Sequence, residues 1–569
     1  MHRHQGSEGG LSAKSPGSAH WPGFGKGGPS CRGETTVSDS NRPDVKTSGV
    51  TMAEAPVRLG EMLLRMGPGM IIAAAVVGSG ELILTPRTGA EAGFTLLWII
   101  LLGCVTKVFV QVELGRYAIE SGQTTLAAIN RLPGPRWRVH WMLWYWVVMF
   151  VVSLAQLGGI AHGVGQALAI ALPIDGSFRQ LLKEQEEWDR EAAQIRRELE
   201  ASFEQPKGSG SAGTASVDKK TVETEVAQRM QRPRPGYENR EGLLTDDLIW
   251  AIIICLVTIP ILVYGRYGMI QWVCTILVVG FTLVTIFCVI GIQFKPEWAI
   301  SWDDLREGLS FRLPGTANRW LALSTALATF GIIGMGTNEL ITYPYWCLEK
   351  GYARFTGPRD NSPGWAKRAR GWMRVMRADA FLSMVVYTFV TAAFYLLGAA
   401  VLYRSELIPA GSQMISYLSE MYVPVLGEWT KAFFLFGAFA VLYSTFFSAT
   451  AGHTRVAADA VAIVRRGRSQ PDRPPQSWVT AFSIGFPLFS LVTCLFYREP
   501  VTLIVASGFM QAIMLPMLAG AALYYRYREC HEALRPGLIW DICLWISAIA
   551  LLVAGLFGAG MGLHRLLAH

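Results

Sequence analysis

The stretches GSGE at residues 78–81 and GMGTNE at residues 334–339 each interrupt a long apolar segment. Each would fall near the middle of a membrane-spanning helix. Because the bilayer core offers no water to exposed backbone groups, broken helices occur at that depth only where they line a cavity or a binding site. Two interrupted segments in corresponding places of two halves indicate the substrate site of a secondary transporter. Each break also carries a carboxylate, Glu81 or Glu339, and charges inside a membrane are costly and usually functional.

The composition is that of a membrane protein. Apolar residues make up 51% of the chain and charged residues 17%, and the mean hydropathy is +0.30. Many windows exceed the roughly 18 apolar residues that a spanning helix needs. The net charge of +8 comes from basic residues in short loops, where membrane orientation places them, so the expected surroundings are a lipid bilayer and not nucleic acid.

Motifs of soluble catalysis and of metal cofactors are absent from the sequence. The nine cysteines are scattered and form no CxxC pair, so neither a disulfide framework nor a zinc site is predicted. The chain has no P-loop, nucleophile elbow or HExxH motif. We therefore expect no enzymatic activity and no cofactor.

Hydropathy predicts an all-α membrane protein of eleven transmembrane helices. A polar segment over residues 1–55 is predicted to be disordered. Met52 is an alternative to Met1 as the first residue of the translated chain. Helices 1–3 fall within 56–172, a charged insert occupies 173–246, and helices 4–11 fall within 247–569. The predicted helices are 67–90, 94–120, 139–172, 247–264, 268–293, 318–347, 374–403, 429–463, 478–497, 499–525 and 537–562.

Basic loops predict the orientation in the membrane. The loops before helices 3, 7, 9 and 11 are rich in Lys and Arg, and all four lie on one side if there are eleven helices. The positive-inside rule then places the N-terminus in the cytoplasm, in a plasma membrane or a bacterial inner membrane. The basic residues include Arg131, Arg136, Arg138, Lys350, Arg354, Lys367, Arg368, Arg465, Arg466, Arg526 and Arg528.

The insert over 173–246 is predicted to lie outside the membrane, on the side opposite the N-terminus. Its first half has apolar residues at helical spacing among dense charges, which predicts an amphipathic helix: Leu181, Trp188, Ala192, Ile195, Leu199 and Phe203. Its second half contains KGSGSAGTAS, a flexible linker. Two interpretations stay open. The helix binds a protein partner or forms an oligomer, or the insert is only a solvent-exposed segment.

Residues 67–98, GPGMIIAAAVVGSGELILTPRTGAEAGFTLLW, resemble the start of the Nramp family of proton-coupled Mn²⁺ and Fe²⁺ transporters. IAHGVGQALA at 160–169 is similar to the family's pattern in helix 3, and GMGTN at 334–338 stands where the family has Val-Met-Pro-His-Asn. The resemblance covers residues 57–562 outside the insert. It implies a leucine-transporter-type fold of two inverted five-helix repeats, with helices 1 and 6 broken.

The resemblance also implies a metal site with altered ligands. Where the family has Asp-Pro-Gly-Asn, this chain has Gly78 and Glu81 at the two ligand positions. Met335 matches the family's methionine ligand, and the carbonyls of Ala75 and Ile332 match its backbone ligands. For Met335, simple packing is the alternative, and for Glu81 it is an ion pair with Lys107 or Arg87.

Further residues are expected along the ion pathway. Thr337 stands at the family's helix-6 His and His162 at its helix-3 Glu, both of which serve proton movement in the family, so weak or absent proton coupling is predicted. Ser79 and Asn338 offer oxygens, although Thr337 and Asn338 also suit an ordinary N-cap. Gln511 lies near a glutamine that approaches the metal in the family. Lys107 is expected to pair with Glu81 or Glu113, because a buried Lys needs a partner.

The sequence therefore predicts an Nramp-like secondary transporter of divalent metal ions, Mn²⁺, Fe²⁺ or Mg²⁺, that works by alternating access. One alternative keeps the fold and replaces the metal with a small organic solute, bound where half-helix N-termini face a carboxylate. Another is a membrane sensor or scaffold that acts through the insert and transports nothing.

Overall fold

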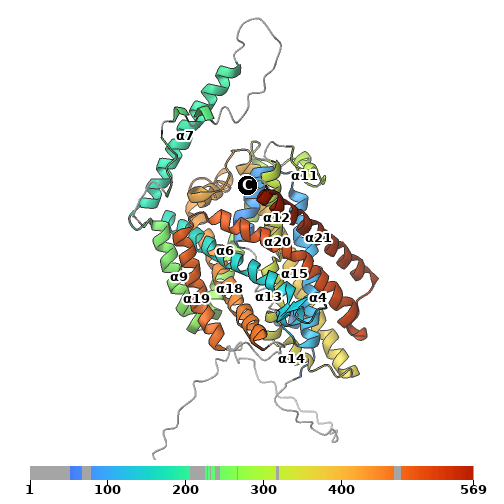
Figure 1. Ribbon diagram of the computed structural model, residues 1–569. Helices are drawn as coiled ribbons and strands as arrows, with labels where there is room; N and C mark the ends of the chain where they lie inside the picture. The colour runs from blue at the N-terminus through green and yellow to red at the C-terminus, as the bar shows by residue number, and fades with distance from the viewer. Residues whose placement is uncertain are drawn as a thin grey trace, which may run out of the picture. The chain divides into compact units, whose positions relative to one another are not determined.

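The computed structural model describes residues 52–66, 78–204, 224–226, 228–230, 232–237, 244–264, 267–315, 319–466 and 476–567. Within these residues the chain is almost entirely helical (Figure 1). The strands found there, β1 Arg136–Trp137 and β2 Val139–His140, pair antiparallel just before helix α6.

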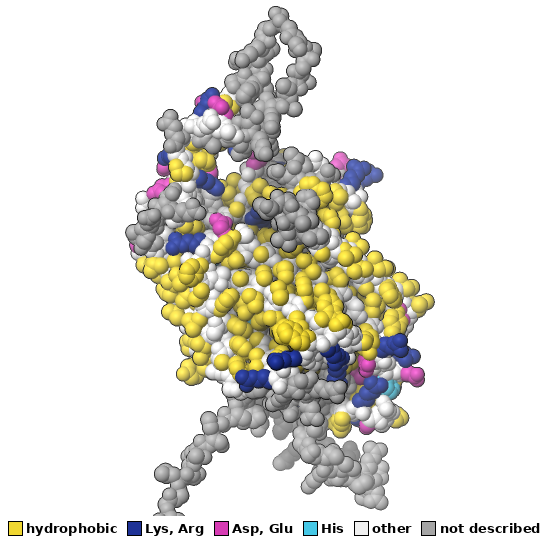
Figure 2. All heavy atoms as spheres, viewed as in Figure 1, with side chains coloured by type: hydrophobic (Ala, Val, Ile, Leu, Met, Phe, Trp, Pro, Cys, Tyr) yellow, Lys and Arg dark blue, Asp and Glu magenta, His cyan; other side chains and the backbone are white. Residues whose placement is uncertain are grey.

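Nine helices in the described residues are long and apolar enough to cross a membrane, and Figure 2 shows an apolar band across the visible face. The predicted helix 268–293 corresponds to α10 (Tyr267–Gly291). The predicted helix 67–90 is described only in part, as π-helix η1 (Gly80–Leu84) followed by α3 (Thr85–Ala92). The count of eleven transmembrane helices therefore stays a prediction. The nine are α4 (Leu97–Ser121), α6 (Trp141–Ala171), α9 (Asp246–Tyr264), α12 (Arg319–Ile332) with α13 (Thr337–Glu349), α15 (Pro363–Leu397) with η4 (Gly398–Leu402), α18 (Thr430–Arg466), α19 (Gln476–Phe496), α20 (Pro500–Tyr524) with η6 (Tyr525–Glu529), and α21 (Leu538–Leu567).

Short helices connect these segments. They are α1 (Leu59–Arg65), α5 (Thr125–Ile129), η3 (Ile292–Phe294), α11 (Trp302–Gly308), α14 (Tyr352–Thr356), η5 (Gly411–Gln413), α16 (Met414–Glu420), α17 (Val423–Leu426) and η7 (Glu532–Leu534). Residues 52–55, predicted as the end of a disordered segment, instead contact the start of α15. The Trp372 indole donates to the Ala53 carbonyl at 2.9 Å, and Lys367 pairs with Glu54 at 2.8 Å. The rest of that predicted segment, up to residue 51, lies outside the described residues.

The predicted break in helix 6 is confirmed. Helix α12 (Arg319–Ile332) ends before it, and α13 (Thr337–Glu349) begins after it. Gly334 has φ +61°, a left-handed conformation that glycine adopts without a steric penalty. In helix 1, η1 begins at Gly80, and residues 67–77 lie outside the described part of the chain, so the position of Ala75 is not described.

The two breaks pack against each other through small residues. A Cβ on Gly80 would lie 2.7 Å from Ile332 Cγ2, at the end of α12. A Cβ on Gly331 would lie 2.0 Å from the Gly508 carbonyl oxygen of α20. Glycines allow this close approach of helices, as is common in membrane interiors. The tight packing brings η1, the helix-6 break and α20 together at one place.

The insert contains the predicted amphipathic helix, α7 (Ser177–Glu204), beside the ends of α6 and α9 (Figure 1). Its apolar face packs on the insert's own Val226 and Met230. At its start, Phe178 and Leu181 pack against residues of α6 and α9. The face that the sequence offers for a protein partner is thus covered, over these residues, by the same chain.

A carboxylate of α7 also binds the segment around α16. Asp189 Oδ2 accepts hydrogen bonds from Arg234 Nη2 at 2.7 Å, Gln413 Nε2 at 2.9 Å and Tyr417 Oη at 3.3 Å. Gln185 Oε1 accepts from Ser412 Oγ at 2.6 Å. The insert is therefore joined to the connection between α15 and α18 as well as to α6 and α9.

Candidate functional site

Glu81 joins the two helix breaks. Its side chain is fully buried. Oε1 accepts a hydrogen bond from the Gly334 N–H at 3.0 Å, and Oε2 accepts one from the Gly78 N–H at 3.4 Å. Arg87, one of the two predicted ion-pair partners, instead pairs with Glu91 at 2.8 Å. The carboxylate thus satisfies backbone groups that the broken helices leave without intrahelical partners.

Lys107 binds the end of α12 and neither of its predicted carboxylate partners. Its Nζ donates to the carbonyls of Phe330 and, at 2.9 Å, of Ile333. These carbonyls lack intrahelical donors because the helix stops there, and a cation at a helix C-terminus is also favoured by the helix dipole. The predicted pairing of Lys107 with Glu81 or Glu113 is therefore wrong.

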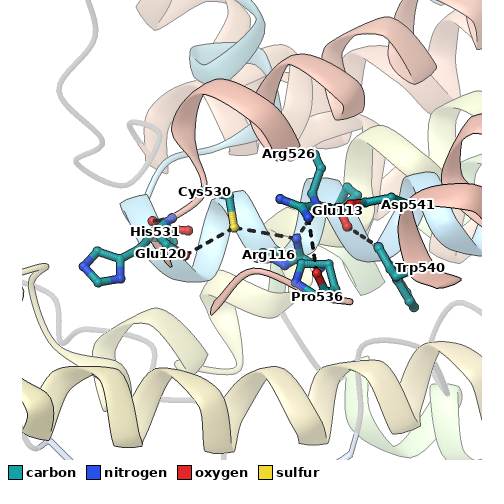
Figure 3. A network of polar contacts seen from close by, with 9 residues as sticks. All are labelled: Glu113, Arg116, Glu120, Arg526, Cys530, His531, Pro536, Trp540 and Asp541. Carbon is teal, nitrogen blue, oxygen red and sulfur yellow. Dashed lines mark hydrogen bonds and ion pairs between the residues drawn. The ribbon is translucent and has the colours of Figure 1, made fainter. Parts of the chain in front are cut away.

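Glu113 has other partners, farther along α4 (Figure 3). Its Oε2 accepts from Arg116 Nη1 at 2.6 Å, and its Oε1 accepts from the Trp540 indole at 2.5 Å. In the same cluster, Arg526 forms two hydrogen bonds with Asp541, at 2.8 and 2.9 Å. These charges hold α4, η6 and α21 together, away from the breaks.

Gln511 of α20 caps the start of α13. Its Oε1 accepts from the Asn338 N–H at 3.3 Å, and its backbone carbonyl accepts from Thr337 Oγ1 at 2.8 Å. The residue in the N-cap position is Gly336, which has no side chain to offer. The predicted capping by Thr337 or Asn338 is therefore replaced by a cap from another helix.

A chain of side-chain hydrogen bonds connects this cap to the first break. Gln511 Nε2 donates to Ser507 Oγ at 3.2 Å, and Ser507 Oγ donates to Gln156 Oε1 at 2.6 Å. Gln156 Nε2, on α6, donates to Ser79 Oγ at 3.3 Å. Residues of α20, α6 and the first break thus form one polar network.

A cavity of about 30 Å³ lies beside this network, which is room for roughly two water molecules. Ser79, Ile332 and Asn338, predicted as site residues, line it, whereas its described lining includes none of Gly78, Glu81 and Met335. The lining consists of Ser79, Gly80, Gln156, Leu157, Ile160, Ile332, Asn338, Glu339, Thr445, Ala449 and His453.

Glu339 is the carboxylate in this lining, and its Oε2 is buried without a hydrogen-bond partner in the described residues. A Cβ on Gly336 would lie 2.3 Å from this Oε2, 2.9 Å from Gln511 Oε1 and 3.1 Å from the Ile332 carbonyl oxygen. Three oxygens from α13, α20 and α12 therefore converge beside the break, where glycine leaves them room. Oxygens of this kind are the ligands that hard divalent cations prefer.

Among the polar lining residues, sequence reasoning did not single out Gln156 and Thr445, and it gave His453 the same two interpretations as His162, a proton shuttle or a structural hydrogen bond. For Glu339 the sequence does carry a signal, because this carboxylate lies about one helical turn from the break. Nothing in the local sequence marks Gln156 or Thr445 as lining residues. No group of three or more His, Cys, Asp or Glu that could hold a metal occurs in the described part of the chain, so a cation here would also need amide and backbone oxygens.

His162 lies outside the cavity's described lining. Its Nε2 is 2.7 Å from Asp247 Oδ2, which also accepts from Tyr237 Oη at 2.8 Å. Burial is the main cause that raises the pKa of Tyr237, with the neighbouring Asp247 as a second cause, so its hydroxyl keeps the proton that it donates. His162 thus contributes to a contact between α6, α9 and the end of the insert.

Known proteins are similar to this chain in sequence and in fold. The family model for natural resistance-associated macrophage protein-like (Nramp) proteins matches residues 69–178 and 242–562. The divalent metal cation transporter MntH of Chromohalobacter salexigens is 30% identical over 139 residues, which are 24% of this chain and 30% of that protein. Metal transporter Nramp2 of Arabidopsis thaliana is 28% identical over 137 residues, 24% of each chain. The matched stretches thus span less than a third of these relatives.

A crystal structure of a mutant of the Eremococcus coleocola manganese transporter aligns with a TM-score of 0.54 at 14% identity, covering 90% of both chains. This likeness shows the fold, the leucine-transporter type with inverted repeats that the resemblance implies. The helices and the comparisons together show an integral, multi-pass membrane protein. Because the family model covers more than half of its residues, the chain belongs to the natural resistance-associated macrophage protein-like family.

Proposed function

We propose that the chain is a secondary transporter of divalent metal ions, Mn²⁺, Fe²⁺ or Mg²⁺, which it moves by alternating access through the cavity at the two helix breaks. Membership of the family supports this proposal. So do the relatives, which are named as transporters of divalent metal cations, of metals and of manganese. In inverted-repeat transporters the substrate site lies where broken helices meet.

The observation that carries the proposal is the unpartnered Oε2 of Glu339 beside Gln511 Oε1 and the Ile332 carbonyl. A buried carboxylate oxygen without a partner is costly, and a cation in the adjoining cavity would stabilise it. In this proposal Glu339 supplies the charge of the site, and Glu81 joins the two breaks through its hydrogen bonds with Gly334 and Gly78. The predicted ligands Met335, Gly78 and the Ala75 carbonyl stay predictions, because the described lining of the cavity contains neither Met335 nor Gly78.

The size of the cavity favours a metal over an organic solute. With room for roughly two water molecules, it suits an ion that keeps one or two waters. The role of sensor or scaffold gains no support from the insert, because its apolar helical face packs on its own chain. In a cell membrane, the basic loops would place the N-terminus in the cytoplasm.

Mn²⁺ uptake into proteoliposomes tests the proposal. We expect saturable uptake of Mn²⁺ by the wild type, and competition by Fe²⁺ and Cd²⁺. Glu339→Gln keeps the shape and removes the charge, so we expect it to abolish uptake while the protein still folds. Glu349→Gln, at the other end of α13 and paired with Arg455 on the surface, is the matched control and should transport normally. Full uptake by Glu339→Gln, or no metal binding to the wild type at millimolar concentration, would contradict the proposal.

A further inference from the structure

His453 is a buried histidine with a ring nitrogen left unpaired in the described residues. It lies on α18, is 5% exposed and lines the cavity beside Glu339. In the described part of the chain Nδ1 is buried without a hydrogen-bond partner. The edge-on contact with the Phe150 ring, at 5.1 Å between centroids, holds the imidazole in place. The ring is therefore fixed at the cavity without a hydrogen-bonding role in the fold.

The contrast with His162 shows what a structural histidine looks like in this protein. His162 is also buried, and its Nδ1 likewise has no partner in the described residues, but its Nε2 is bonded to Asp247, so its ring has a role in the fold. Buried polar groups are nearly always hydrogen-bonded, and each exception calls for an explanation. The exception at His453 lies on the same cavity as the unpartnered Oε2 of Glu339. One occupant of the cavity that binds both a carboxylate and an imidazole would account for both exceptions.

The packing of α18 brings His453 toward α13. A Cβ on Gly452 would lie 3.1 Å from Thr342 Cγ2, one helical turn beyond Asn338. The side-chain amide of Asn338, also in the lining, has no hydrogen bond in the described residues. The cavity is thus bordered by a carboxylate, an amide and an imidazole, all three with free bonding capacity.

We propose that His453 is a nitrogen ligand of the transported ion and sets its preference for transition metals over Mg²⁺ and Ca²⁺. This inference rests on the proposed function and names a determinant of its specificity. Imidazole binds first-row transition metals well, whereas Mg²⁺ and Ca²⁺ prefer oxygen ligands. The thioether of Met335, the residue from which the sequence predicted this preference, is not in the cavity's described lining.

Pulsed electron paramagnetic resonance on bound Mn²⁺ tests the nitrogen ligand directly. The purified full-length protein in lipid nanodiscs is loaded with substoichiometric Mn²⁺. We expect modulation from a directly bound ¹⁴N nucleus, which shifts when histidine is labelled with ¹⁵N. The signal should vanish in His453→Gln, which keeps a polar oxygen at that position, and persist in His162→Gln, the matched buried control.

Competition binding gives a second readout. In His453→Gln we expect Mn²⁺ and Co²⁺ affinity to fall at least about tenfold, since loss of even an outer-shell partner costs about 10–100-fold. Mg²⁺ affinity should stay within a factor of about three, because oxygen ligands remain. Size-exclusion profiles identify a variant that fails to fold, and His453→Asn then takes the place of His453→Gln in both measurements.

The outcomes separate the two proposals. If the wild type binds Mn²⁺ and Glu339→Gln abolishes binding, but no nitrogen signal is seen and His453→Gln keeps its selectivity, the role of His453 is refuted and the transport proposal stands. If the wild type binds no divalent metal, both are refuted. A nitrogen signal that survives in His453→Gln also overturns the role of His453.

Discussion

The two acidic residues at the helix breaks have different surroundings, and this difference assigns their proposed roles. Glu81 receives hydrogen bonds from two backbone N–H groups, whereas Glu339 Oε2 has no partner in the described residues. A carboxylate whose oxygens already accept hydrogen bonds has less to gain from a cation than one without partners. The free charge at the cavity therefore belongs to Glu339.

Gly336 provides a steric test of this arrangement. Its φ of −64° is open to any residue, so Gly336→Ala adds a methyl group without straining the backbone. That methyl would lie 2.3 Å from Glu339 Oε2 and 2.9 Å from Gln511 Oε1, so both oxygens must move. We expect Mn²⁺ affinity to fall at least about tenfold, by analogy with the loss of a supporting ligand contact.

The measurement is metal titration of the purified variant, with thermal unfolding as a check on folding. Gly520→Ala is the control, because a Cβ there meets nothing within 4 Å. Wild-type affinity in Gly336→Ala would show that the three converging oxygens do not hold the metal.

At the scale of elements, the broken helix 6 depends on other helices at both of its inner ends. Lys107 of α4 binds two carbonyls at the end of α12, and Gln511 of α20 accepts from the Asn338 N–H at the start of α13. A helix end buried without such partners would leave several backbone groups unsatisfied. The break is thus stable because two neighbouring helices replace the missing backbone hydrogen bonds.

Lys107→Met tests the cap on α12. Methionine keeps most of the length of the side chain and removes the donor, so the two carbonyls lose their partner. We expect a loss of about 1–3 kcal/mol in the free energy of unfolding, measured by thermal unfolding in nanodiscs. Lys295→Met, at an exposed lysine, should leave the unfolding temperature unchanged. An unchanged unfolding temperature in Lys107→Met would refute the capping role.

The insert allows a test of a different element. Because Asp189 accepts three hydrogen bonds from Arg234, Gln413 and Tyr417, Asp189→Ala should loosen α7 from the connection at α16. We expect faster hydrogen exchange in α7, followed by mass spectrometry. Glu186→Ala, less than one turn away and paired only at the surface with Arg190, should exchange like the wild type. Equal exchange in both variants would mean that apolar packing alone holds the helix.

At the scale of the whole molecule, the groups that replace the family's proton-handling residues are engaged elsewhere. Thr337 donates its hydroxyl to the Gln511 carbonyl, and His162 is bonded to Asp247 near the insert. Neither Thr337 nor His162 is in the described lining of the cavity. The path of a proton would therefore have to differ from the one that the resemblance implies.

We accordingly predict that metal uptake carries few protons or none. A pH-sensitive dye inside proteoliposomes reports acidification while Mn²⁺ enters. The expected result is Mn²⁺ entry with little pH change, and with little acceleration by an inward proton gradient. Acidification proportional to Mn²⁺ entry would overturn this prediction, and its loss in His453→Gln or His162→Gln would then identify the proton carrier.

The sequence by itself determined the membrane architecture. Hydropathy and glycine-flanked breaks are local properties of the chain, because a helix in lipid must satisfy its own backbone wherever it lies. They predicted the long helices, the break at Gly334 to Gly336 and the amphipathic helix α7, and the motifs around residues 67–98 predicted the family.

Only the tertiary structure decided which side chains meet at the breaks. Glu81, Lys107 and Gln511 lie on three different helices, and which backbone group each one binds depends on how the helix ends face each other. The same holds for Glu339 and His453, which are 114 positions apart in the numbering and line one cavity. A polar residue in an apolar helix shows from sequence that it needs a partner, but its partner is selected by packing between helices, which no local pattern records.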